Sequence, residues 1–209
     1  GGGLRGVGAV TAVCADKGSP GASTLALLLA AASPNRPLLV EADPAGGDLP
    51  QRLFAGTGCT HPAGANLLAL AGDSRKGTDP RMVAAHAAMT SLGVPLVEGL
   101  SNADQQVGLA PLWPSLVAAL SASADDVIAA LGRVSANHPG LAVAASAQRI
   151  VVVVRPRLED LLRLRDRVRH LRAVAAGDAA PLTIVVVSPD KSAQQDQDAT
   201  SRVLADAAL

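Results

Sequence analysis

The stretch from Val10 to Ala32 constrains the fold most, because an apolar segment enters a glycine-containing turn and leaves it as a run of alanine and leucine. The pattern predicts a buried strand, a turn and a helix that begins at Ser23. Gly18 and Gly21 allow the backbone of the turn to approach an anion without a Cβ atom in the way. Amide groups of such a turn, together with those of the helix's first turn, form a positively polarised cradle. The sequence therefore predicts a phosphate-binding loop.

The turn reads KGSPGAST and resembles the KGGxGKTT loop, or deviant Walker A motif, of the ParA/MinD family of P-loop ATPases. The matching residues are Lys17, Gly18, Gly21, Ser23 and Thr24, whereas Ser19 and Ala22 depart from the motif. The resemblance implies that ATP is bound by Lys17, Gly18, Ser19, Pro20, Gly21, Ala22, Ser23 and Thr24. It also implies Mg²⁺ at the Ser23 hydroxyl, and a homodimer in which Lys17 acts as a catalytic residue on the partner's phosphates.

A second match follows the next predicted strand, which spans residues 37–42. Because side chains alternate along a strand, Glu41 and Asp43 are predicted to point the same way, beyond its carboxyl end. The segment over 41–49 resembles the DxDPQGN stretch of the same family, with Glu41 in place of the first aspartate. The resemblance implies that Asp43 lies near Mg²⁺ and orients the attacking water.

A third match departs from the family at the position of its aspartate. Residues 125–133 are predicted to form a buried strand and resemble the segment DVIVDLGR. The aspartate of that segment would hold the magnesium shell, and Ala130 takes its place here. The chain thus lacks both the second metal-side carboxylate, at Ala130, and the usual loop lysine, at Ala22.

Segments of strand and helix type alternate along the chain. The predicted strands cover 7–15, 37–42, 93–99, 125–133, 150–154 and 181–187, and the predicted helices lie within 23–32, 46–54, 66–71, 80–92, 104–120, 157–172 and 201–209. Residues 190–198 are predicted to be loop. The alternation predicts an α/β fold, a mostly parallel sheet with helices on both faces, in a P-loop NTPase-like three-layer sandwich. We expect one domain over 1–209, and the initial Gly1 is compatible with truncation at both ends.

The predicted helix over 157–172 has an apolar and a basic side. We expect Leu158, Leu161, Leu162, Val168 and Leu171 on its buried face and arginines on the other. The basic side has two interpretations: a solvated face balanced by neighbouring acids, or weak, non-specific contact with DNA or a membrane surface. The second interpretation is what the resemblance to the ParA/MinD family implies, and the contact would involve Arg163, Arg167 and Arg169.

Composition excludes several classes of protein. The net charge is zero and 49% of residues are hydrophobic, which disfavours a disordered or strongly nucleic-acid-binding chain. No apolar run reaches the roughly 18 residues of a membrane span, so no transmembrane segment is expected. Cys14 and Cys59 show no ligand-like spacing, which favours a reduced, cytoplasmic protein.

The resemblance implies an ATP-dependent switch that positions chromosomes, plasmids or other cellular cargo. A second hypothesis is a pseudo-ATPase, a scaffold or protein-binding module that has lost hydrolysis. A dinucleotide-binding enzyme is disfavoured because the turn lacks G-x-G-x-x-G spacing.

Overall fold

The computed structural model describes residues 7–16, 21–54, 64–175, 180–188 and 193–205. These ranges contain a seven-stranded sheet in the order β3-β4-β2-β5-β1-β6-β7. The strands are β1 Val10–Ala15, β2 Leu38–Glu41, β3 Ala88–Met89, β4 Pro95–Val97, β5 Val127–Arg133, β6 Arg149–Val154 and β7 Leu182–Val186. All neighbouring strands are parallel except β3 and β4. The predicted mostly parallel α/β sheet is confirmed.

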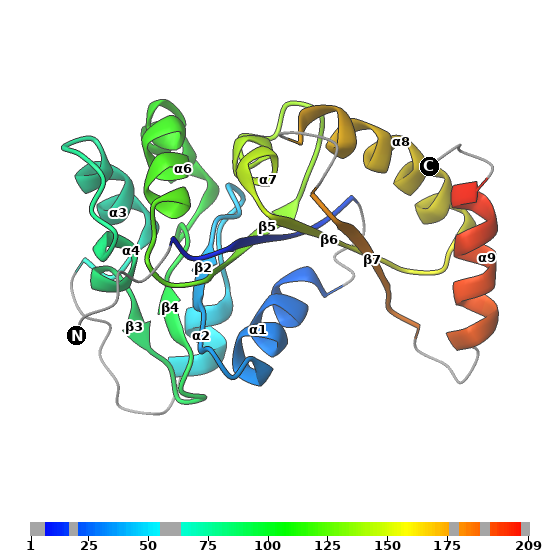
Figure 1. The fold of residues 1–209 in the computed structure, drawn as a ribbon, viewed down its shortest axis with the longest axis horizontal. Helices are drawn as coiled ribbons and strands as arrows, with labels where there is room; N and C mark the ends of the chain where they lie inside the picture. The colour runs from blue at the N-terminus through cyan, green and yellow to red at the C-terminus, as the bar shows by residue number, and fades with distance from the viewer. Residues whose placement is uncertain (1–6, 17–20, 55–63, 176–179, 189–192, 206–209) are drawn as a thin grey trace.

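Helices cover both faces of the sheet (Figure 1). They are α1 Ala22–Ala32, α2 Leu49–Phe54, α3 Leu67–Ser74, α4 Met82–Ala85, α5 Gln106–Leu109, α6 Trp113–Ser121, α7 Leu141–Ser146, α8 Leu158–Val174 and α9 Ala193–Ala205, with 3-10 turns at Ala103–Gln105 and Ala110–Leu112. The helices α1 and α2 pack on one face, and α3, α6, α7 and α8 pack on the other. No helix within the described ranges is long and apolar enough to cross a bilayer.

Alternation along the central strands divides the core into two clusters. In β1, Ala12 and Cys14 face the cluster with α8, whereas Val13 and Ala15 face the cluster with α1. In the same way Ala129 and Ala130 of β5 face opposite sides. Strands buried on both faces explain the unbroken apolar segments of the sequence.

The predicted helix over 80–92 is wrong in its second half. The helix α4 ends at Ala85, and β3 follows and pairs antiparallel with β4. The turn between these strands is closed by hydrogen bonds from Thr90 N to Val94 O at 3.0 Å and from Gly93 N to Thr90 O at 2.9 Å. Gly93 has a φ of +71°, a conformation that glycine adopts readily, so the turn interrupts the apolar pattern.

Two helices differ from the sequence prediction. The segment predicted as loop over 190–198 contains the start of α9, and α7 was not predicted. The polar sequence of α9 lacks an apolar stripe at its start, but Asp196 in its first turn complements the helix dipole. Short or polar helices of this kind leave little periodicity in a sequence.

Candidate functional site

The helix α1 begins at Ala22, after β1 along the chain. Gly21 precedes the helix with a φ of +99°, and no side-chain cap hydrogen bond is present there among the residues that the structure describes. The first turn also contains no acidic residue. Ala22 is buried, whereas Ser23 and Thr24 are half-buried. Unpaired amides at a helix N-terminus attract anions, so this end of α1 fits a phosphate group.

Only half of the predicted loop lies within the described residues. Gly21, Ala22, Ser23 and Thr24 lie at the start of α1, directly after β1 and the turn. Lys17, Gly18, Ser19 and Pro20 lie outside the described ranges. Their assignment to the nucleotide and the assignment of Lys17 to catalysis therefore remain predictions.

Asp43 lies two residues beyond β2, beside the end of β5. Its Oδ1 atom accepts a hydrogen bond from Ala45 N at 2.8 Å, and its carboxylate packs against the backbone of Gly132. A Cβ atom at position 132 would overlap the Asp43 carboxylate, and the φ of Gly132 is +62°. Burial raises the pKa of Asp43, and the Ala45 hydrogen bond opposes this only in part. A partly buried carboxylate with a raised pKa is stabilised by a cation, so Asp43 suits a Mg²⁺ ion.

Glu41 does not share the orientation of Asp43, so the prediction that the two point the same way is wrong. Glu41 is 2% exposed, and its two carboxylate oxygens accept hydrogen bonds from Leu49 N at 3.1 Å and Gly99 N at 3.2 Å. The carboxylate leaves no room for a side chain at Gly47. Because β2 ends at Glu41, strand alternation does not extend to position 43. Glu41 thus fixes the segment after β2.

Ala130, where the sequence comparison predicted a missing carboxylate, lies in β5. It pairs with Glu41 of β2 and with Val13 of β1, at the centre of the sheet. Ala130 is 2% exposed and belongs to the same apolar cluster as Ala22 of α1. The two positions where the family carries opposite charges are therefore both apolar and buried on the same face of the sheet.

The sequence analysis missed a partly buried ion pair at the end of β1. Arg167 Nε of α8 lies 2.8 Å from Asp16 Oδ1, and the two side chains are 16% and 13% exposed. Arg133 Nε donates to Asp16 O at 2.9 Å. Of the three arginines predicted on the basic side of this helix, Arg167 is therefore engaged in an ion pair, while Arg163 and Arg169 are exposed. The only sequence signal was Asp16, an acid directly before the loop.

The apolar face of α8 also differs from the prediction. Leu161, Leu164, Val168 and Leu171 are buried. Leu158 and Leu162, which we expected in the core, are 67% and 46% exposed. The buried residues follow one another from Leu161 at intervals of three or four, which leaves Leu162 off the buried face, and Leu158 is the first residue of the helix.

The described residues contain no cluster of three or more His, Cys, Asp or Glu side chains that could hold a metal ion. Cys59 and His61 lie outside the described ranges. Cys14 is buried in β1, and burial raises the pKa of its thiol to about 12. Cys14 is therefore a protonated core residue without nucleophilic character.

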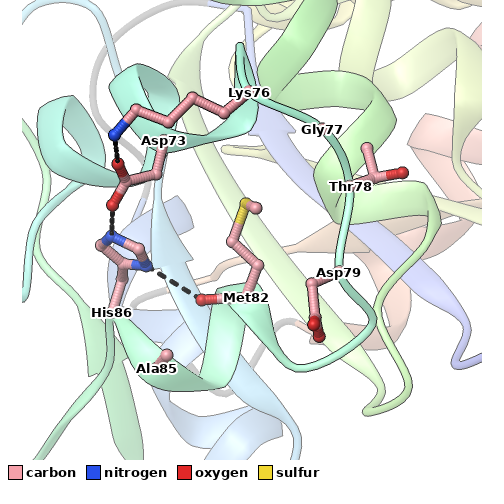
Figure 2. A pocket seen from close by; sticks show the side chains of 8 residues that line it. All are labelled: Asp73, Lys76, Gly77, Thr78, Asp79, Met82, Ala85 and His86. Atoms are coloured by element: carbon pink, nitrogen blue, oxygen red, sulfur yellow. Dashed lines mark hydrogen bonds and ion pairs between the residues drawn. The ribbon is translucent and has the colours of Figure 1, made fainter.

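A separate cavity of about 440 Å³ lies where α3 is joined to α4 (Figure 2). Asp73 contacts Lys76 Nζ at 2.8 Å and His86 Nε2 at 3.1 Å. His86 Nδ1 lies 2.9 Å from Met82 O, and must donate because a carbonyl only accepts. These contacts of Asp73, Lys76 and His86 join α3 to α4.

Comparison with solved structures identifies the architecture. The chain matches a ParA family ATPase from Chlorobium tepidum TLS with a TM-score of 0.70 and 20% identity, covering 94% of this chain and 81% of that one. It matches the septum site-determining protein MinD from Pyrococcus horikoshii OT3, complexed with Mg-ADP, with a TM-score of 0.63 and 16% identity over 91% of this chain and 76% of that one. Cobyrinic acid a,c-diamide synthase from Mycobacterium smegmatis, with bound ADP and magnesium, matches with a TM-score of 0.67 and 21% identity over 95% of this chain and 81% of that one.

No family model and no curated protein matches the sequence. At the identities of the three structures, the likeness establishes the fold and leaves the activity open. This chain has the fold of the ParA/MinD ATPases.

Proposed function

We propose that the chain binds Mg-ATP at the carboxyl edge of its sheet and acts as a ParA/MinD-like switch in partitioning or cellular positioning. One observation carries the proposal: the uncapped start of α1 follows β1, and Asp43 follows β2, with β5 alone between these strands. Helix amides favour phosphate, and a carboxylate favours Mg²⁺. The solved neighbours that hold ADP and magnesium support the choice of ligand.

The roles of the residues follow from their positions. Ser23 and Asp43 would hold Mg²⁺, and the phosphates would contact Lys17, Gly18, Ser19, Pro20, Gly21, Ala22 and Thr24. Bound ATP supplies the phosphoanhydride bond that hydrolysis cleaves. The Asp43 carboxylate would orient the attacking water. Lys17 would reach the phosphates of a second copy in a homodimer.

A specific observation favours the second candidate, a scaffold that binds nucleotide without useful hydrolysis. Ala22 and Ala130 remove one positive and one negative group from the site that the family uses. A charge-assisted contact to phosphate contributes about 1.5–3 kcal/mol, so binding would weaken and still persist on backbone amides. Catalysis depends more strongly on charges that stabilise the transition state.

Calorimetric titration with Mg-ATP and Mg-ADP tests the binding proposal. We expect micromolar affinity in the unchanged chain and loss of binding in Ser23→Asp. The new carboxylate would repel phosphate while complementing the dipole of α1, so the variant should keep its fold. NAD serves as the comparator ligand. No binding of either adenine nucleotide up to millimolar concentration would contradict the proposal.

Phosphate release by Asp43→Asn separates the switch from the scaffold. If the chain hydrolyses ATP, this variant should lose hydrolysis at least tenfold while its affinity for Mg-ATP stays within a few fold. Circular dichroism controls for folding. Hydrolysis that survives in Asp43→Asn would remove Asp43 from the mechanism, and hydrolysis absent from the unchanged chain that binds Mg-ATP would favour the scaffold.

Partner binding belongs to the same proposal. The homodimer would form through the nucleotide, and weak contact with DNA or a membrane surface would use the exposed Arg163 and Arg169. Arg167 does not contribute to that surface because it pairs with Asp16.

A further inference from the structure

A cavity of about 390 Å³ lies beside the end of β1, on the α8 side of the sheet. Its polar and charged lining, here named the arginine pocket, consists of Asp16, Arg133, Ser135, Arg163, Asp166, Arg167 and His170. These residues come from the end of β1, from the end of β5 and the segment after it, and from α8. Three guanidinium groups from two distant segments thus meet at one cavity.

The positive charges of the arginine pocket are only partly balanced. Asp16 is paired with Arg167 at 2.8 Å. Asp166, the other acid at the cavity, lies 3.7 Å from Arg165 and 3.8 Å from Arg169, neither of which lines the cavity. Arg133 and Arg163 have no carboxylate partner among the residues that the structure describes. Two arginines therefore remain uncompensated in one pocket.

Several donors of the pocket are already held in place. The Nε atoms of Arg133 and Arg167 are bound by Asp16, which leaves their terminal Nη amino groups for another acceptor. His170 Nε2 is buried and lacks a hydrogen-bond partner within the described ranges. A ligand that meets fixed donors loses less side-chain entropy on binding, so this arrangement favours a bound anion.

We propose that the arginine pocket binds a small phosphorylated anion with at least two negative charges, at a site separate from the start of α1. Guanidinium groups match the oxygens of phosphate in a bidentate manner. Two uncompensated arginines call for a dianion, and the cavity volume falls within the range of small-molecule sites. The proposal does not depend on nucleotide binding at α1.

Calorimetric titration with inorganic pyrophosphate, without magnesium and at constant ionic strength, tests this site. We expect pyrophosphate binding that weakens tenfold or more in Arg163→Ala, since Arg163 lines the cavity and is exposed, so its truncation should leave the core intact. Arg172→Ala is the matched control, because Arg172 is an exposed arginine of the same helix outside the cavity. It should bind pyrophosphate as the unchanged chain does.

The Ser23→Asp variant distinguishes this site from the proposed nucleotide site. It should lose Mg-ATP and keep pyrophosphate, whereas Arg163→Ala should show the reverse. Pyrophosphate binding that disappears in Ser23→Asp and persists in Arg163→Ala would place the anion at α1 and overturn the proposal. Absence of binding up to millimolar pyrophosphate, or tighter binding of citrate than of pyrophosphate, would overturn it as well.

Discussion

At the scale of single residues, Glu41 and Asp43 show how two nearby carboxylates take different roles. The Glu41 side chain is directed into the protein and accepts two backbone hydrogen bonds, while Asp43 lies at the sheet edge against Gly132. Burial is the largest influence on both groups and raises the pKa of each. The difference lies in accessibility, since Glu41 is 2% exposed and Asp43 is half-buried. Only Asp43 can therefore meet a ligand.

Removal of the Glu41 carboxylate should destabilise the fold. In Glu41→Ala, the amides of Leu49 and Gly99 lose their acceptors. Each buried donor left without a partner costs about 1–3 kcal/mol, so we expect the free energy of unfolding to fall by roughly 2–4 kcal/mol. Urea denaturation measures this quantity. Glu41→Gln keeps one acceptor oxygen and should lose less, and equal stability of Glu41→Ala and the unchanged chain would contradict the assigned role.

The residues Ala22 and Ala130 are informative as a pair. A lone lysine or a lone aspartate on this buried side of the sheet would leave an uncompensated charge, which is strongly destabilising. Both alanines belong to one apolar cluster and are nearly inaccessible to solvent. Alanine at both positions is therefore compatible with a stable core, whereas one charged residue alone at either position would not be.

At the scale of secondary structure, long periodic segments were predictable and short ones were not. The sequence predicted β1, α1, β2, β5, β6 and α8 within a few residues, because each is apolar or amphipathic over most of its length. It missed α7, which has six residues, and β3, which has two. Pairing of β3 with β4 depends on a turn at Gly93 rather than on strand propensity.

The candidate site also has parts that could be predicted from the sequence and parts that could not. Asp43 and the start of α1 could be predicted because each follows a recognisable strand. The contact between Asp16 and Arg167 spans 151 positions of the sequence, so no local pattern reveals it. The helix α8 is amphipathic and carries several arginines. Its packing, which the sequence does not reveal, decides that Arg167 is the one turned toward β1.

At the scale of the whole molecule, both candidate binding sites lie at the carboxyl edge of the sheet, one on each face of the sheet. The start of α1 lies on one side of β1, and the arginine pocket lies on the other. Asp16 belongs to the pocket and directly precedes Lys17 of the predicted loop. Parallel strands bring these segments together because β2, β5, β1, β6 and β7 all present their carboxyl ends at this edge.

The pH dependence of global stability should depend on His138, which is 8% exposed and follows β5. Its Nδ1 atom accepts a hydrogen bond from Gly140 N at 3.0 Å, so the folded ring is neutral. Burial, and secondarily the charge of Arg167, lower the pKa of His138 from 6.5 to about 4. The unfolded chain therefore binds a proton at higher pH than the folded chain does. The stabilising effect of the neutral ring is complete above about pH 6.5 and is lost progressively toward pH 4.

We expect His138→Gln to remove this part of the acid sensitivity. The shift of the pKa corresponds to a loss of about 3 kcal/mol in the unchanged chain between pH 7 and 4. Glu41 and Asp43 oppose this loss, because their raised pKa values stabilise the fold as the pH falls. The difference in unfolding free energy between the two chains isolates His138, since both carboxylates are common to them. Urea denaturation at several pH values should give a difference that narrows with acidification, and a difference that stays constant from pH 7 to 4 would show that His138 is not held neutral by the fold.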